Sequence, residues 1–222
     1  MARKSIDPLL ALVVFLGAFL CVSCASGRVD PEAEKHFWQW FQQNDQRLAR
    51  SESNVELVTE INDHLKQVNP DLTCTIGPKT EGQREFIISA DGLREVFPAV
   101  ISLADHAPKS ERWQIIKFRQ ASSPQVLNFE GLSLEPKDCY FDCEPENDMV
   151  KLTLYVKGYD AEPKMAALAL LMLDHLLGEY DVETKIGTID PKDLSARLPA
   201  SKNISHVREA VDEVLSKNKS KK

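Results

Sequence analysis

Three dipeptides in this chain place an acid directly before a histidine, and these two side-chain types bind metals and transfer protons. They are Asp63-His64, Asp105-His106 and Asp174-His175. Neighbours in a helix do not share a face, so no dipeptide forms a dyad by itself. The last two pairs would meet only if the two halves of the chain packed symmetrically, and they could then hold a metal or shuttle protons. We expect instead that the histidines lie exposed at helix ends, where the helix dipole favours a positive charge.

Established catalytic motifs are absent from the sequence. It contains no Gly-x-Ser-x-Gly elbow, no His-Glu-x-x-His, no Walker loop and no Gly-x-Gly-x-x-Gly. We therefore assign no catalytic residue, no metal ligand and no cofactor. The expected role is that of a binding or structural module. The alternative is a hydrolase or another enzyme with an Asp/His site that the fold assembles, which a pocket lined by Asp105, His106, Asp174 and His175 would favour.

The cysteines beyond the N-terminal region have two interpretations. Cys139 and Cys143 share a strand-like segment, where a separation of four residues is about 13 Å and too far for a direct bridge. A disulfide from Cys74 to one of them is geometrically open, and export would permit it. The alternative, which we favour, is that all three are small buried hydrophobic residues.

The N-terminus has the order of an export signal. Arg3 and Lys4 precede an apolar run from Leu9 to Val22, and small residues follow. This run is shorter than the roughly 20 residues that a membrane-spanning helix needs. Its exit, Val22-Ser23-Cys24, resembles a bacterial lipobox, in which the cysteine carries the lipid and becomes the new N-terminus.

We therefore expect a signal peptide, palmitate on Cys24 and a lipoprotein anchored to a membrane of the cell envelope. The main alternative is cleavage after Ala25, where Ser23 and Ala25 form the small-x-small pattern. That cleavage would give a soluble secreted or periplasmic protein. An uncleaved anchor is the third alternative.

Composition favours an ordinary globular protein over one that binds nucleic acid. Of the 222 residues, 43% are hydrophobic and 27% are charged, and the formal net charge is −7. An acidic body without a basic stripe argues against nucleic acid as a partner. The lysine-rich end from Lys217 to Lys222 is expected to be a solvated tail. The membrane is then a partner through the lipid on Cys24, and a protein or small-molecule partner is not identified.

The first half of the mature chain is expected to change from helices to strands. Asp30-Pro31-Glu32 contains residues that cap and open a helix, and an apolar stripe predicts a second helix over about 53–68. Alternation predicts strands over 72–76 and 84–90. A helix to Ala107 follows, in which Pro98 marks either a kink or the first turn, and a strand over 113–119 ends this half.

The second half repeats that order. Strands are expected over 139–143, 149–158 and 183–189, with helices over 160–177 and 203–217. The helix over 160–177 is apolar almost all round and should be the most buried element. The fold class is therefore α+β: an antiparallel sheet covered by helices, with flanking helices at both ends. The order also allows two successive strand-strand-helix-strand units, although it is a common way to cover a sheet.

These elements give the following domain assignment. Residues 1–23 are the export signal, 24–30 a tether, 31–217 a single α+β domain and 218–222 a basic tail. A dense aromatic group, Phe37-Trp38-x-Trp40-Phe41, lies in the first helix of the domain. We expect this helix to be wedged between the sheet and its neighbour. The alternative is an exposed aromatic face for a partner or a membrane surface.

Several stretches resemble an uncharacterised family of bacterial proteins. They are Phe37-Trp38-x-Trp40-Phe41, Arg84 to Gly92, Phe97 to Val100, Arg112-Trp113 with Phe118-Arg119, and Gly178 to Lys185. They span about residues 36–190. The resemblance implies a single α+β module and no particular activity or ligand. Because the stretches fall at predicted strand-to-helix junctions, a structural role accounts for them.

Overall fold

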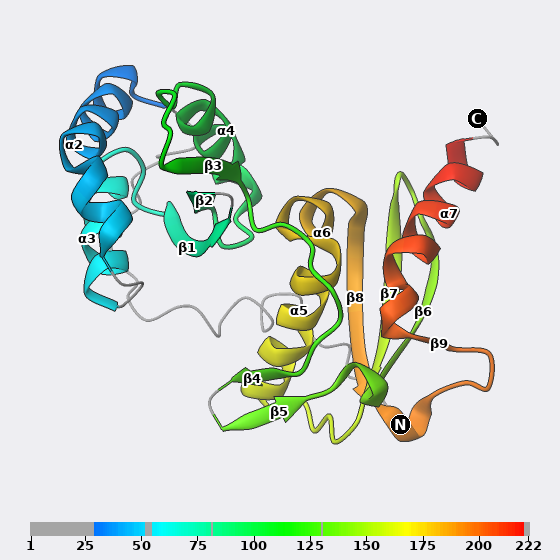
Figure 1. Cartoon of the computed structure of the whole chain (residues 1–222). Coiled ribbons are helices and arrows are strands. Elements are labelled where there is room, and N and C mark those ends of the chain that lie inside the picture. Colours follow the sequence, from blue (N-terminus) through cyan, green and yellow to red (C-terminus); the bar gives the residue numbers. More distant parts are fainter. Residues whose placement is uncertain (1–28, 52–54, 81, 130, 220–222) are drawn as a thin grey trace. The chain divides into compact units, whose positions relative to one another are not determined.

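The computed structural model describes residues 29–51, 55–80, 82–129 and 131–219. The predicted leader, Cys24 and its lipid therefore lie outside the described residues. The chain forms two compact units that divide between Gln120 and Ala121 (Figure 1). We call them the N-terminal unit and the C-terminal unit and describe each by itself.

The N-terminal unit contains helices and a three-stranded sheet. Its elements are α2 (Pro31–Arg50), α3 (Val55–Leu65), β1 (Thr73–Thr80), β2 (Gln83–Ser89), α4 (Phe97–Asp105) and β3 (Trp113–Lys117), with a 3₁₀ turn over Arg94–Val96. The strand order is β1-β2-β3. The β1–β2 hairpin is antiparallel, and β3 returns parallel to β2 after the α4 crossover.

Local sequence explains where the helices of this unit begin. The Asp30 side chain accepts a hydrogen bond of 3.0 Å from the backbone N–H of Glu32, and Pro31 occupies the first helical position of α2. Pro98 lies in the first turn of α4. It therefore opens that helix and does not kink it, which settles the alternative left open by the sequence.

Aromatic side chains of α2 form the core of the N-terminal unit. Phe86 of β2 is completely buried, and its ring stacks on those of Phe37 and Phe41. Trp38 is 5% exposed and meets Phe86 edge to face. The aromatic group is thus packed between helix and sheet, as expected. Trp40 is the least buried of the four and stacks on the His64 ring.

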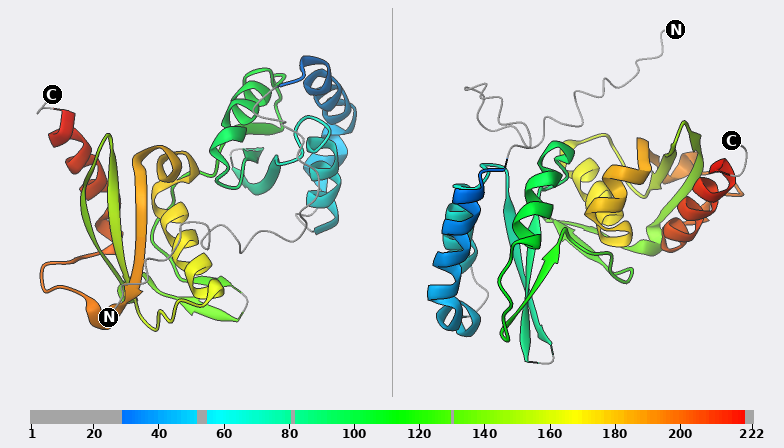
Figure 2. Two further views of the ribbon diagram at one scale, coloured as in Figure 1. Left: turned by 180° about the vertical axis from the view of Figure 1, so that it is seen from behind. Right: turned by 90° about the horizontal axis from the view of Figure 1, so that it is seen from above.

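The C-terminal unit contains a four-stranded sheet, a small hairpin and three helices among the described residues (Figures 1 and 2). Its elements are β4 (Leu127–Phe129), β5 (Leu132–Leu134), β6 (Cys139–Glu146), β7 (Met149–Val156), α5 (Pro163–Leu177), α6 (Glu179–Lys185), β8 (Ile186–Asp193), β9 (Lys202–Asn203) and α7 (Val207–Lys219). The strand order is β8-β7-β6-β9. Helix α7 packs on β6 and β7, and α5 packs on α7 and on the β4–β5 hairpin.

Both units use the same central topology. In each, an antiparallel hairpin is followed by a helical crossover and by a third strand parallel to the second: β2 with β3, and β7 with β8. The predicted α+β fold of two strand-strand-helix-strand units is confirmed. The sheet was expected to be antiparallel, but each unit also contains one parallel pair of strands. The pair is parallel because a helical crossover returns the chain in its original direction.

Each unit has its own hydrophobic core. The first core contains Phe37, Trp38, Phe41 and Phe86. The second centres on β7, whose Val150, Leu152, Leu154 and Val156 are all at most 2% exposed, and on α5. The range 31–217, expected to hold one domain, thus contains two separate cores.

The strand expected over 183–189 begins later than predicted. Helix α6 spans Glu179–Lys185, and β8 begins at Ile186. Gly178 ends α5 with a φ of 84°, a left-handed backbone conformation that glycine adopts without strain. Because this turn redirects the chain into a second short helix, Val182 lies on a buried helical face and not in the sheet.

Candidate ligand-binding groove of the N-terminal unit

The acid–histidine pairs lie at helix ends, as the sequence predicts, but of the three histidines only His106 is exposed, while His64 and His175 are partly buried. His64 is in the last turn of α3, His106 caps the C-terminus of α4, and His175 is in the last turn of α5. The Asp105 and Asp174 pairs belong to different units. Each has partners within its own unit: Asp105 binds Lys117, His106 contacts Glu34, and the His175 ring contacts the Gln125 amide.

These pairs do not form a metal centre with their neighbours. Within the part of the chain that the structure describes, no group of three or more His, Cys, Asp or Glu side chains has the arrangement of a metal site. Of the four residues that would favour an enzyme, only His106 lines a cavity described below. Its acidic partner there is Glu34 and not Asp105.

Glu34 of α2 is the buried partner of His106. Glu34 is only 3% exposed, and its Oε2 lies 2.9 Å from His106 Nδ1. The other carboxylate oxygen, Oε1, is buried and has no hydrogen-bond partner. A buried acceptor without a partner costs roughly 1–3 kcal/mol, so the fold leaves one of its stronger acceptors unused.

Asp45 repeats this arrangement further along α2. Its Oδ2 accepts a hydrogen bond of 2.7 Å from Arg112 Nη1, while its Oδ1 is buried without a partner. Asp45 lies eleven residues after Glu34. Eleven residues are about three helical turns, so both carboxylates project from the same face of α2. Each therefore has one oxygen bound to a basic side chain and one buried oxygen without a hydrogen-bond partner.

Two neighbouring cavities lie beside these carboxylates. The first, of about 320 Å³, is lined by Pro31, Glu34, Lys35, Trp38, Gln39, Gln42, His106 and Pro108. The second, of about 310 Å³, is lined by Trp38, Phe41, Gln42, Asp45, Pro108, Lys109, Ser110, Glu111, Arg112 and Ile115. They share Trp38, Gln42 and Pro108. We call the two cavities together the α2 groove.

Hydrogen bonds hold the wall of the α2 groove opposite α2. The Trp38 indole Nε1 donates to the backbone oxygen of Leu103 at 2.9 Å, which fixes α2 against the end of α4. The Gln83 side-chain amide donates to the backbone oxygen of Ser110 at 3.0 Å. Ser110 Oγ in turn accepts from the backbone N–H groups of Arg112 and Trp113. The segment that carries His106 and Arg112 is thus tied to both α2 and the sheet.

The groove residues were not identified from sequence alone, although a signal was present. Glu34, Trp38, Phe41 and Asp45 follow the i, i+4, i+7, i+11 spacing of one helical stripe. Trp38 and Phe41 are core residues, so the same stripe places two acids at positions normally occupied by hydrophobic side chains. Acids on a core-facing stripe indicate either a buried ion pair or a ligand site.

The cysteines are free thiols in the structure. Cys74 and Cys139 are buried, and Cys143 is partly buried. The interpretation as small buried hydrophobic residues is thus confirmed for the first two, and the disulfide alternative is not seen among the described residues. Burial raises the pKa of Cys74 and that of Cys139 to about 12.

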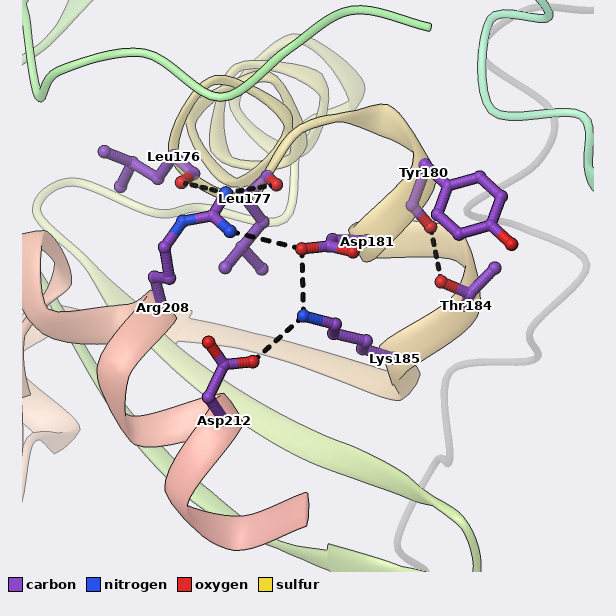
Figure 3. Close-up of polar contacts among 8 residues, drawn as sticks. All are labelled: Leu176, Leu177, Tyr180, Asp181, Thr184, Lys185, Arg208 and Asp212. Carbon is purple, nitrogen blue, oxygen red and sulfur yellow. Dashed lines mark hydrogen bonds and ion pairs between the residues drawn. The ribbon is translucent and has the colours of Figure 1, made fainter. Parts of the chain in front are cut away.

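The Gly178–Lys185 stretch has a packing role that Figure 3 shows. Arg208 of α7 donates to the backbone oxygens of Leu176 and Leu177 at the end of α5 and to Asp181 of α6. Lys185 joins Asp181, at 3.0 Å, to Asp212 of α7, at 2.9 Å. The stretch therefore docks α7 on the α5–α6 corner.

Comparison of the chain with family models, with curated proteins and with solved structures found no match. In residues 29–219, leaving aside the gaps named above, no helix is both long enough and apolar enough to cross a membrane.

Proposed function

We propose that this chain is an exported, lipid-anchored protein of the bacterial cell envelope that acts as a binding module, with the α2 groove as its ligand site. The observation that carries the proposal is the pair of carboxylates, Glu34 and Asp45, each with a buried oxygen that lacks a partner beside a cavity. The export signal and Cys24 support the location.

The stability cost of these two acids supports a binding role. Glu34 occupies a buried position of α2, and Asp45, whose side chain is 22% exposed, has one buried oxygen. An apolar side chain at either position would avoid the cost of a buried, unpaired acceptor. Such local conflicts between packing and polarity concentrate at functional sites.

Adjacent glutamines on α2 allow a matched test of the groove. Gln42 lines both cavities, whereas Gln43 is exposed and lines neither. A low-molecular-weight fraction of host envelope extract should raise the melting temperature of the unaltered chain and of Gln43→Phe, because a ligand stabilises the state that it binds. Gln42→Phe should lose this rise. An equal rise in all three proteins, or none in the unaltered chain, would contradict a binding site in the groove.

The proposed anchor has a separate test. Metabolic labelling with palmitate should mark the unaltered protein and should not mark Cys24→Ser, since the lipid needs the cysteine sulfur. Cys143→Ser, which alters a thiol outside the leader, is the matched control and should keep the label. An unlabelled mature protein that begins at Ser26 would instead show ordinary secretion.

A hydrolase remains the second candidate because of one observation. His106 is oriented by a buried carboxylate at a cavity, and its side chain is 69% exposed, which is the arrangement of a general base. Among the described residues that line this cavity none is a serine, threonine or cysteine, so water would be the nucleophile. Hydrolysis of a panel of activated esters and amides that is lost in His106→Gln and kept in His64→Gln would favour the enzyme.

A further inference from the structure

We propose that the outer edge of β3 in the N-terminal unit binds an extended peptide segment of another protein, which adds a strand to the sheet beside the α2 groove. This inference rests on the proposed binding function and names the ligand class of that groove. It starts from the main-chain groups that β3 leaves unused and from the cavity next to them.

The main-chain groups of β3 alternate in direction. The parallel ladder begins where the N–H of Arg84 in β2 donates to the backbone oxygen of Arg112 at 2.7 Å. Because the register between the two strands is continuous, the even-numbered residues of β3 bond to β2. No strand pairs with the other side of β3 among the described residues (Figure 1). The odd-numbered residues direct their N–H and C=O groups to that side: Trp113, Ile115 and Lys117.

Side chains satisfy the two ends of this edge and leave its centre unused. Ser110 Oγ accepts from the Trp113 N–H, and the Gln120 side-chain amide donates to the Lys117 backbone oxygen. Within the described part of the chain, no group bonds to the N–H or the C=O of Ile115. A donor and an acceptor on the same side of one residue are the groups with which an added strand pairs.

The other long outer strands have features that prevent such pairing. In β1, the Cys74 N–H donates to the Asn62 side chain of α3, and the register shifts near Pro78. Strand β8 has a register shift and contains Pro191. Strand β6 is covered by β9 at one end and contains Pro145 further along. Prolines, bulges and covering segments are the usual protection of a sheet edge against another strand.

Strand β3 lacks these features. It has five residues, an ordinary strand length, with no proline and no shift in its register with β2. Its one charged residue, Lys117, lies at the end of the strand, where the side chain forms an ion pair with Asp105. The centre of the edge is therefore able to accept an extended main chain.

The cavity beside the edge selects the side chain of the peptide. Ile115 is half-buried and lines the cavity of about 310 Å³. Opposite residues of paired strands share a face of the sheet, so the peptide residue opposite Ile115 directs its side chain toward this cavity. The cavity lining has equal numbers of acids and bases, namely Asp45, Glu111, Lys109 and Arg112. An uncharged side chain therefore fits best, and the residue that carries it cannot be proline because it must donate its N–H.

Selection from a phage-displayed library of random nonapeptides on the purified full chain tests the inference. The recovered peptides are synthesised, and calorimetric titration should show one peptide per chain. Ile115→Pro removes the outward N–H without removing a bond to β2, so it should weaken binding by about tenfold to a hundredfold. Ile115→Val keeps the N–H and is the matched control, which should bind the peptides like the unaltered chain.

Amide hydrogen exchange in the unaltered chain tests the same contact without any variant. A bound peptide should slow exchange of the Ile115 amide by at least about tenfold, with a smaller effect on the Gln114 amide, which already bonds to β2. Equal peptide affinity in Ile115→Pro, unchanged exchange at Ile115, or a selection that recovers no peptide would overturn the inference. A dimer that protects Ile115 without peptide would also overturn it, because the partner would then be a second copy of the chain.

Failure of this inference can be told apart from failure of the proposed function. Envelope extract that still stabilised Gln43→Phe and Ile115→Pro, but not Gln42→Phe, would leave the α2 groove as a binding site for another ligand class. Extract that stabilised none of the proteins would contradict the groove itself.

Discussion

At the scale of single residues, the acids of α2 contribute less to folding than their burial would indicate. Glu34 is almost completely buried, yet the side chain of its partner His106 is 69% exposed to solvent. Removing the acid would therefore leave no buried charge behind. This separates Glu34 from buried ion pairs in which both partners are desolvated and the loss of one is strongly destabilising.

Glu34→Met should therefore leave the free energy of unfolding unchanged or raise it by up to about 2 kcal/mol, because an apolar side chain of similar length removes the unpaired acceptor. Urea denaturation followed by tryptophan fluorescence measures this change. Glu56→Met, at an exposed position of α3, is the control and should stay within about 0.5 kcal/mol. A loss above about 1 kcal/mol for Glu34→Met would show that the carboxylate is needed for folding and would weaken the argument for function.

The thiols give a second prediction at this scale. Thiolates are the reactive form, and burial raises the pKa of Cys74 and of Cys139 to about 12, so neither should be alkylated in the folded chain at about pH 8. The Cys143 pKa is also raised by burial, but this thiol is only partly buried and should react first. Peptide mapping after iodoacetamide treatment, with and without urea, reads the order. Rapid labelling of Cys74 without urea would contradict its burial.

The same thiols make stability depend on pH. Their folded pKa values lie above the unfolded value of about 8.5, so their contribution is complete below about pH 8.5 and is lost as the pH rises toward about 12.

At the scale of elements, hydrophobic periodicity predicted helices and strands well where the pattern of a segment fitted only one of the two. The alternation of Val150, Leu152, Leu154 and Val156 identified the buried face of β7. The prediction failed after Gly178. There Tyr180, Val182 and Thr184 alternate with charged residues, a pattern typical of a strand, but the segment forms the short helix α6. The groove could not be predicted, since it needs the segment of His106 and Arg112 to lie beside α2, and only long-range packing establishes that contact.

Helix α5 shows both the strength and the limit of a composition argument. Its apolar residues encircle the axis, but Leu171 is 40% exposed while Met172 is 2% exposed. Met172→Ala should therefore lower the free energy of unfolding by about 2–5 kcal/mol through loss of packing and an internal cavity. Leu171→Ala should change it by less than about 0.5 kcal/mol. An equal loss of unfolding free energy in the two variants, measured by urea titration followed by circular dichroism, would show that Leu171 is buried in solution.

At the scale of the whole molecule, the same central topology occurs in both units, and each unit adds different helices to it. Both units contain a hairpin, a helical crossover and a parallel third strand. The C-terminal unit adds α7, which Arg208 and Lys185 fasten to α5 and α6. The N-terminal unit adds α2, and the α2 groove forms between this added helix and the segment that follows α4. The candidate site thus depends on an element outside the repeated topology.

Separate cores predict that damage to one unit stays within it. The chain has three tryptophans, Trp38, Trp40 and Trp113, and all belong to the N-terminal unit, so their fluorescence reports on that unit alone. Met172 belongs to the core of the C-terminal unit. Met172→Ala should therefore move part of the urea transition seen by far-ultraviolet circular dichroism to lower concentration and leave the fluorescence transition in place, since non-coincident probes reveal separate cooperative units. Phe86→Ala, in the other core, should do the reverse. An equal shift of both transitions in Met172→Ala would show that the two cores unfold together. Residues 31–217 would then form one cooperative unit, as expected for a single domain, despite the two compact units of the structure.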